Sequence, residues 1–252
     1  MALLTDGNVS ALADLQAYDS SILETARTEG VSLDAKLAVA QEAIGLEIAA
    51  FLLRTQSAST LSAQESAYEL GKVVVTPALR RWHTLRTLAE VYCDVHGNQM
   101  NERYLAKWRH FSKLAREAAD LIYELGVGLV SVPIPRPRKP AVTAVGSGGV
   151  AGSYIVQVAW RSSTGASGAP SEPVSLNAPE GELFQVDAGA APGHVSGFDV
   201  YAGVDGGPVT LQTLAPMPAG AIWAVPLTGL ISGLPLPEGQ LPEFYVRRNR
   251  SL

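Results

Sequence analysis

The chain has 252 residues, of which 47% are hydrophobic and 17% charged, and its formal net charge is −5. This length is typical of one or two domains, and the composition allows ordinary buried cores and excludes a disordered chain. No apolar run reaches the roughly 20 residues of a membrane-spanning helix, and Met1–Ser10 lacks the basic-then-apolar order of a secretory signal. The only cysteine, Cys93, excludes an internal disulfide and a cysteine-rich metal site. We therefore expect folding in a reducing cytosol, without contact with a membrane.

The charges alternate in blocks along the chain. Up to Gly71, ten acidic residues face three basic ones, and from Lys72 to Arg116 nine basic residues face three acidic ones. Blocks of opposite sign suit docking between subunits, although solvated helix faces would give the same pattern. We assign to contacts between subunits the basic residues Arg80, Arg81, Arg109 and Lys113.

The first half of the sequence has the period of amphipathic helices, with apolar residues at spacings of three and four. The predicted helices cover Ala11–Ala17, Ile22–Thr28, Leu33–Phe51, Pro77–Tyr92 and about Asn101–Leu125. Thr76-Pro77 marks a helix start, because proline at the first helical position loses no needed N–H. Gly97-Asn98 is expected to end that helix, and Gly126 to end the next one in a left-handed conformation.

The second half has the period of strands separated by glycine, proline and serine turns. The predicted strands are Tyr154–Arg161, Val174–Asn177, Leu183–Asp187, Gly197–Gly203, Thr210–Leu214 and Ile222–Val225. They suit an antiparallel β-sandwich. The expected fold class is α+β as two domains. We predict a helical domain over 1–131, a proline-rich linker over 132–140, a β-sandwich over 141–226 and an extended tail over 227–252. The prolines of the linker favour a semi-rigid polyproline spacer, with a ligand for an SH3-like groove as the alternative.

No catalytic constellation or cofactor fingerprint emerges from the sequence, so we expect no enzyme, cofactor or metal. Cys93 and His96 lie three apart on one helix, where both are expected to pack against a neighbouring helix. Gly146-Ser147-Gly148-Gly149 resembles a phosphate loop only in composition and is interpreted as a turn before the first strand. Asp187 and Asp199 could imitate a glycosidase pair, but any acidic sandwich offers such pairs.

The end of the tail has an alternating triplet followed by arginines. An extended segment of this kind can add a strand to an exposed sheet edge, and arginine forks pair well with carboxylates or phosphates. A disordered solvated tail is the alternative. We predict docking on a partner through Phe244, Tyr245, Val246, Arg247, Arg248 and Arg250.

The helical half resembles the adaptor, or head-tail connector, proteins of tailed phages. The segments that carry the resemblance are Ser32–Leu53 and Thr76–Gly126, through helix order, length and character. The second half is similar to the fibronectin type III or immunoglobulin-like modules of phage structural proteins. Gly152–Leu176, with its Gly168–Pro173 turn, and Gly197–Thr213 carry that similarity.

The resemblance implies a structural virion protein, assembled in the host cytoplasm and located at the phage neck. It would form a homo-oligomeric ring, expected to be a dodecamer, that joins the portal protein to a tail or neck protein. DNA would pass through the lumen with only non-specific contacts, and the tail would dock on the portal. Most connectors lack the added domain, which leaves open whether the chain is the adaptor proper or another neck or tail protein. A virion binding module whose sandwich holds a host-surface glycan or protein is the alternative. A cell-wall hydrolase has little in its favour.

Overall fold

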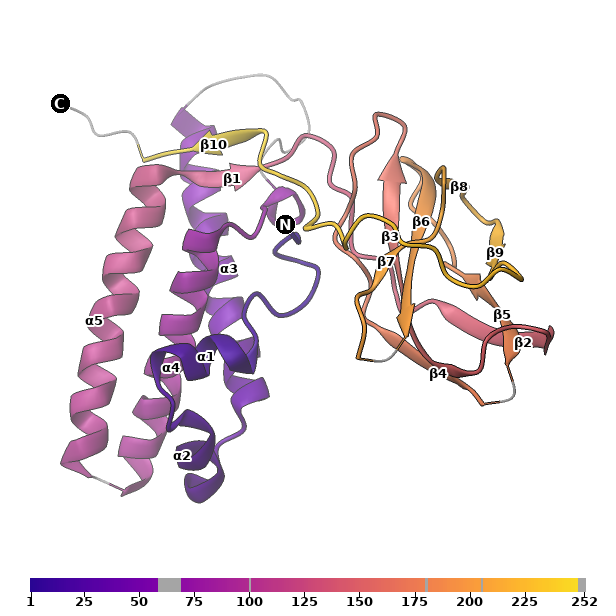
Figure 1. Cartoon of the computed structure of the whole chain (residues 1–252). Coiled ribbons are helices and arrows are strands. Elements are labelled where there is room, and N and C mark those ends of the chain that lie inside the picture. The colour runs from indigo at the N-terminus through magenta and orange to yellow at the C-terminus, as the bar shows by residue number, and fades with distance from the viewer. Residues whose placement is uncertain (59–68, 100, 180, 205, 249–252) are drawn as a thin grey trace. The chain divides into compact units, whose positions relative to one another are not determined.

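The structure, a computed structural model, describes residues 1–58, 69–99, 101–179, 181–204 and 206–248 (Figure 1). The chain forms two compact units, which we describe separately. The helical unit consists of Leu4–Ser131 and Pro242–Leu252, and the β unit of Met1–Leu3 and Val132–Leu241. The predicted α+β class with a helical and an antiparallel β region is confirmed. None of the described helices has both the length and the apolar character needed to cross a bilayer.

The helical unit has three long helices as its frame. Its elements are α1 (Leu12–Tyr18), α2 (Ile22–Glu29), α3 (Leu33–Ala58), the 3-10 turn η1 (Leu70–Lys72), α4 (Pro77–Gln99), α5 (Glu102–Leu125), β1 (Val127–Leu129) and β10 (Phe244–Val246). Helix α4 packs against both α3 and α5, which are therefore the outer helices (Figure 1). Each helix predicted from apolar spacing is present.

Local capping explains where the long helices begin. The Thr76 hydroxyl accepts a hydrogen bond from Leu79 N at 3.3 Å, and Pro77 occupies the first helical position of α4. The Asn101 side chain caps α5 by accepting from Arg103 N at 2.9 Å. The prediction that Gly97-Asn98 ends α4 is wrong, since the helix continues to Gln99. A single glycine costs a helix only about 1 kcal/mol, which packing against α5 offsets.

Gly126 ends α5, but not in the left-handed conformation we predicted. Its φ is 111° and its ψ 146°, an extended conformation with positive φ that favours glycine. A Cβ at this position would lie 2.8 Å from the Cβ of Tyr245. The glycine therefore turns the chain directly from α5 into β1 and makes room for β10 beside it.

The core of the helical unit lies where α4 meets its two neighbours. Tyr92 of α4 stacks on Phe111 of α5 with ring centroids 5.7 Å apart, and Trp82 meets the edge of Tyr123 at 5.9 Å. Ile44 and Ile48 of α3 are fully buried on the other side of α4. Burial of such side chains is the main source of stability of the unit.

The end of the chain returns to the helical unit as a strand. β10 pairs antiparallel with β1, with Val127 opposite Val246 and Leu129 opposite Phe244. The chain expected to form one tail over 227–252 is thus divided: Leu227–Leu241 belongs to the β unit and Pro242 onward to the helical unit. A strand is formed where the sequence predicted one, and its main chain is paired within its own subunit.

The β unit contains two antiparallel sheets. One has the order β2 (Ala141–Ser147), β5 (Glu182–Asp187) and β9 (Ile222–Ala224). The other has β4 (Val174–Ala178), β3 (Gly152–Ser162), β6 (Val195–Val204) and β7 (Thr210–Leu211), and β8 (Met217–Pro218) pairs with β6. Both sheets contribute to one core, in which Tyr154 of β3 meets Phe184 of β5 at 5.2 Å. Leu227–Leu241 joins this unit through Leu211 N, which donates to Leu234 O at 2.8 Å.

The chain thus inserts the β unit between two paired strands of the helical unit. Ser131 N donates to Glu243 Oε2 at 2.9 Å, and Glu243 N donates to Leu129 O at 2.8 Å, so the two ends of the insertion lie side by side. We expect a chain in which an Asn-Gly turn replaces Val132–Leu241 to fold with an unchanged helical core. Circular dichroism and thermal melting would check this. An unfolded product would show that the helical unit depends on the β unit.

Candidate functional site

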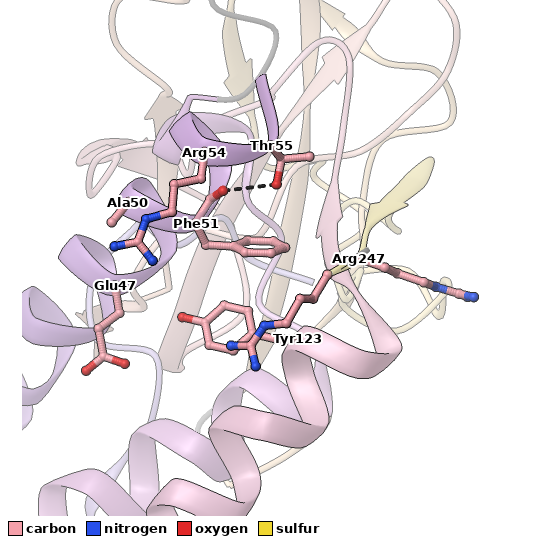
Figure 2. A pocket seen from close by; sticks show the side chains of 8 residues that line it. Glu47, Ala50, Phe51, Arg54, Thr55, Tyr123 and Arg247 are labelled. Atoms are coloured by element: carbon pink, nitrogen blue, oxygen red, sulfur yellow. Dashed lines mark hydrogen bonds between the residues drawn. The ribbon is translucent and has the colours of Figure 1, made fainter. Parts of the chain in front are cut away.

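A hollow of the helical unit lies between the end of α3, the end of α5 and the segment after β10 (Figure 2). It has a volume of about 510 Å³. Its lining consists of Glu47, Ala50, Phe51, Arg54, Thr55, Tyr123, Arg247 and Arg248. We call it the arginine pocket. It combines an aromatic floor with the guanidinium groups of Arg54 and Arg248, a composition suited to anionic ligands.

The floor of the pocket is formed by two aromatic rings in contact. Phe51 and Tyr123 lie with ring centroids 4.8 Å apart, and Tyr123 is only 7% exposed. Its hydroxyl nevertheless points toward the same space as the side-chain ends of Arg54 and Glu47 (Figure 2). Burial and the charge of Glu47 raise the pKa of Tyr123 to about 12, against the opposing effect of Arg248 and Arg54. The hydroxyl therefore stays protonated and can donate a hydrogen bond.

The segment after β10 is held in place by contacts with the end of α5. Arg248 N donates to Tyr123 O at 2.9 Å, and the Arg248 guanidinium lies 5.0 Å from the centroid of the Tyr123 ring. Arg247 Nε donates to Leu125 O at 2.9 Å. These arginines are thus fixed parts of the pocket wall. Of the residues assigned to partner docking, Arg250 lies outside the described residues.

The other predicted docking residues serve the fold of the chain itself. Val246 is buried in the helical core and Phe244 packs against that core, while Tyr245 is half exposed. The expected addition of this strand to a sheet edge occurs on β1 of the same chain. Arg54 and Tyr123 are not recognisable as site residues from the sequence, because the pocket exists only once three segments distant in the sequence meet.

The four basic residues assigned to contacts between subunits fall into two groups. Arg80 and Arg81 lie in the first turn of α4, while Arg109 and Lys113 lie in the half of α5 nearest to the α4–α5 turn. Since Tyr92 packs on Phe111 and Trp82 on Tyr123, the groups are separated by roughly 20 Å along the helices. All four are exposed, and within the described residues Arg80, Arg81 and Arg109 have no carboxylate partner. Lys113 pairs with Glu117 at 3.8 Å.

Some acidic and basic residues of the two oppositely charged blocks form ion pairs within one subunit. Lys36 of α3 pairs with Asp94 of α4, and Arg86 of α4 pairs with Glu47 of α3 at 3.4 Å. These pairs join the acidic and basic blocks inside one chain. The charge reversal near Lys72 therefore does not by itself indicate contacts between subunits.

One side of α3 presents apolar side chains to solvent. Val39, Leu46 and Leu53 are 48%, 67% and 61% exposed, and their spacing of seven places them on one face of the helix. The acidic residues Asp34 and Glu42 are exposed on the same helix. An apolar stripe of this kind, flanked by charge, is typical of an interface between proteins.

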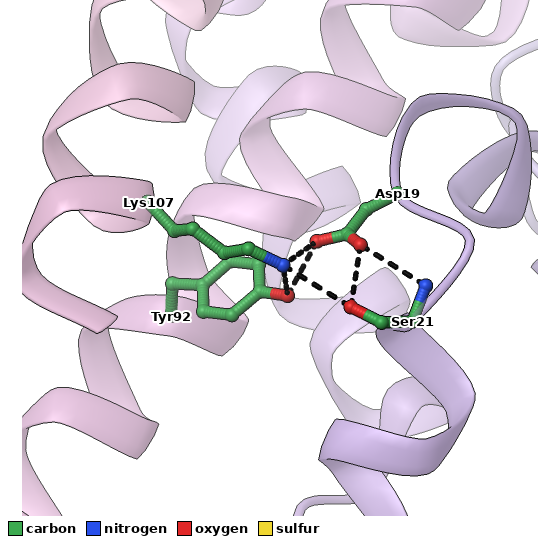
Figure 3. Close-up of polar contacts among 4 residues, drawn as sticks. All are labelled: Asp19, Ser21, Tyr92 and Lys107. Atoms are coloured by element: carbon green, nitrogen blue, oxygen red, sulfur yellow. Dashed lines mark hydrogen bonds and ion pairs between the residues drawn. The ribbon is translucent and has the colours of Figure 1, made fainter. Parts of the chain in front are cut away.

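A buried polar cluster fixes the loop between α1 and α2 to the long helices (Figure 3). Lys107 Nζ donates to Asp19 Oδ2 at 2.6 Å, to the Tyr92 hydroxyl at 2.9 Å and to Ser21 Oγ at 3.1 Å, and Tyr92 donates to Asp19 Oδ2 at 2.5 Å. Burial alone would raise the pKa of Asp19, but the hydrogen bonds from Lys107, Tyr92 and Ser21 outweigh it and lower that pKa to about 2. All its partners stabilise the ionised form, so the cluster is a structural anchor.

Cys93 and His96, the other two residues considered for catalysis, have the surroundings of residues that pack within the fold. Cys93 is partly buried, and burial with the charges of Glu90 and Asp94 raises its pKa, the opposite of what a nucleophile needs. His96 stacks on Trp108 with ring centroids 6.1 Å apart, which places it against the neighbouring helix.

The two carboxylates of the β unit considered as a pair lie on different sheets. Asp187 lies on β5 and Asp199 on β6, which are in different sheets. Asp199 is buried and pairs with Arg161 at 2.5 Å. In the part of the chain that the structure describes, no cluster of His, Cys, Asp or Glu could hold a metal.

The sequence matches no known protein-family model, and no curated protein matches it either.

Proposed function

We propose that the chain is a structural protein of a tailed-phage neck, which forms a ring that joins the portal to the tail and lets DNA pass through its lumen. The resemblance of Ser32–Leu53 and Thr76–Gly126 to connector proteins supports this, as does the order of the helices. The observation that carries the proposal is the exposed apolar stripe of Val39, Leu46 and Leu53 on an outer helix.

The stripe suits a contact between unlike faces of neighbouring subunits. The exposed side of α3 carries Asp34 and Glu42, whereas the first half of α5 carries Arg109 and Lys113 and its second half the exposed Glu117, Asp120 and Glu124. Two α3 faces would repel each other, while α3 of one copy and the basic first half of α5 of the next attract. Because α4 packs against both helices, such a head-to-tail contact leaves a free face on each side, and a rotation between copies that closes on itself would give the proposed ring.

We further propose that the β unit is a β-sandwich of the fibronectin type III or immunoglobulin-like kind that decorates the ring. Its support is the single core shared by two antiparallel sheets. The alternative of a glycan-binding module needs exposed aromatic rings. All six aromatic residues of Val132–Leu241 are buried: Tyr154, Trp160, Phe184, Phe198, Tyr201 and Trp223.

Light scattering after size-exclusion chromatography, with negative-stain images, tests the ring. We expect the full chain to form a closed oligomer and Leu46→Asp to be monomeric, because a carboxylate cannot be buried in the apolar contact. Leu214→Asp is the matched control, since Leu214 is 98% exposed in the β unit. A wild-type chain that stays monomeric at high concentration, also when portal is added, would contradict the proposal.

A further inference from the structure

We propose that the arginine pocket is a binding site for a carboxylate side chain in a peptide segment of a protein partner. Arg54 and Arg248 would supply the charged donors, and the Tyr123 hydroxyl a third donor. This inference does not depend on ring formation, because every lining residue belongs to one subunit.

The donors are available, and contacts with Tyr123 position Arg248. Arg54 and Arg248 have no carboxylate partner among the described residues, and neither has the Tyr123 hydroxyl a hydrogen-bond partner there. The Arg248 guanidinium is fixed by the contact with the Tyr123 ring, and its main chain by the hydrogen bond to Tyr123 O. A fixed guanidinium loses little conformational entropy when it binds a planar carboxylate.

The one acidic residue of the lining offsets only part of this positive charge. Glu47 pairs with Arg86 at 3.4 Å, outside the pocket lining. The lining therefore keeps the charge of Arg54 and Arg248 against a carboxylate that Arg86 also contacts. The remaining charge favours an anion, and the presence of Glu47 favours a single carboxylate over a ligand of high charge density.

The apolar floor indicates a peptide rather than a bare anion. Ala50 and Phe51 line the side of α3, and the ring of Tyr123 completes the floor. A glutamate or aspartate next to aliphatic residues would bury its stem and its neighbours on this floor while its carboxylate meets the guanidinium groups. A volume of about 510 Å³ accommodates two or three side chains of this size.

Nucleic acid fits the same pocket less well. Bases bind proteins by stacking on accessible aromatic faces, but Arg248 covers one face of Tyr123 and Phe51 packs against its ring. Phosphates of a duplex lie on a convex surface, whereas the donors here surround a hollow. The DNA expected to pass the ring is therefore not the ligand that this site selects.

Fluorescence polarisation with a peptide that carries an uncharged dye tests the proposal on the full chain. The probe is the amidated peptide Gly-Leu-Glu-Leu-Gly, and the matched probe has Gln in place of Glu. We expect the Glu peptide to bind at least tenfold more tightly, with an affinity that falls as salt rises. Arg54→Gln and Arg248→Gln should each weaken it about tenfold, the effect of a charged hydrogen bond, and Tyr123→Phe by a smaller factor.

Two controls separate this site from general attraction by basic residues. Arg103→Gln removes an exposed arginine at the other end of α5 and should leave the affinity unchanged. Arg248→Lys keeps the charge and the fold but loses the fork, and should still weaken binding. Equal binding of the Gln peptide, an equal loss in Arg103→Gln, or displacement of the peptide by a short DNA duplex at lower concentration would each overturn the proposal.

Discussion

A chain that ends at Leu241 is expected to have a helical unit that melts roughly 10 °C lower than in the full chain. The truncation removes β10, and with it the buried side chain of Val246 and the packing of Phe244 against the core. It also removes the bonds from Glu243 N to Leu129 O and from Arg248 N to Tyr123 O. Together these contacts contribute about 3 kcal/mol. Differential scanning calorimetry of the full and truncated chains measures the change.

Matched variants distinguish the loss of β10 from a general effect of shortening. A chain that ends at Arg248 keeps β10 and should melt like the full chain. Val246→Asp places a carboxylate in the core, whereas Tyr245→Asp changes a half-exposed residue of the same strand. Only Val246→Asp should be strongly destabilising. If the chain that ends at Leu241 melts at the temperature of the full chain, β10 contributes nothing and is free to dock elsewhere.

The long helices and the pairing of β10 with β1 differ in how far the sequence alone predicts them. Helices α3, α4 and α5 follow from local apolar spacing, because a helix buries one stripe of residues close in sequence. The strand over Phe244–Val246 was predicted from its alternation, but its partner β1 precedes it by more than a hundred residues. Nothing in a local pattern specifies such a pairing, so the sequence suggested a partner protein.

The same limit applies to the missed strand β2 and to the arginine pocket. β2 is exposed along most of its length, so its sequence, rich in small residues, shows no alternation between buried and exposed positions.

Arg54 is the one basic residue of the last described turns of α3, and Tyr123 lies on the apolar face of α5 near Gly126. Either residue alone looks ordinary, and only their position with Arg248 around one hollow makes them a candidate site.

Lys107→Met is expected to destabilise the helical unit by about 3 kcal/mol at pH 7, because it leaves the Asp19 carboxylate buried without its cation. The side chain of Asp19 is 9% exposed, and the replacement keeps the aliphatic stem that packs beside Tyr92. Urea unfolding measures the change. Lys113→Met is the matched control, since Lys113 makes only an exposed pair with Glu117 and should cost well under 1 kcal/mol.

Asp19→Asn tests the cause of this loss through its dependence on pH. The pKa of Asp19 is about 2 in the folded chain against an ordinary value of 3.8, so the ionised carboxylate contributes about 2 kcal/mol above pH 4. A lowered folded pKa means that this stability is present above the unfolded pKa and is lost as the pH falls toward 2. The advantage of the wild type over Asp19→Asn should therefore shrink by about 1.5 kcal/mol between pH 6 and pH 2.5. Taking the difference cancels other titrating groups, such as the buried His83, whose pKa burial lowers. A constant difference over this range would mean that hydrogen bonds of Asp19, and not its charge, hold the loop between α1 and α2 against α4 and α5.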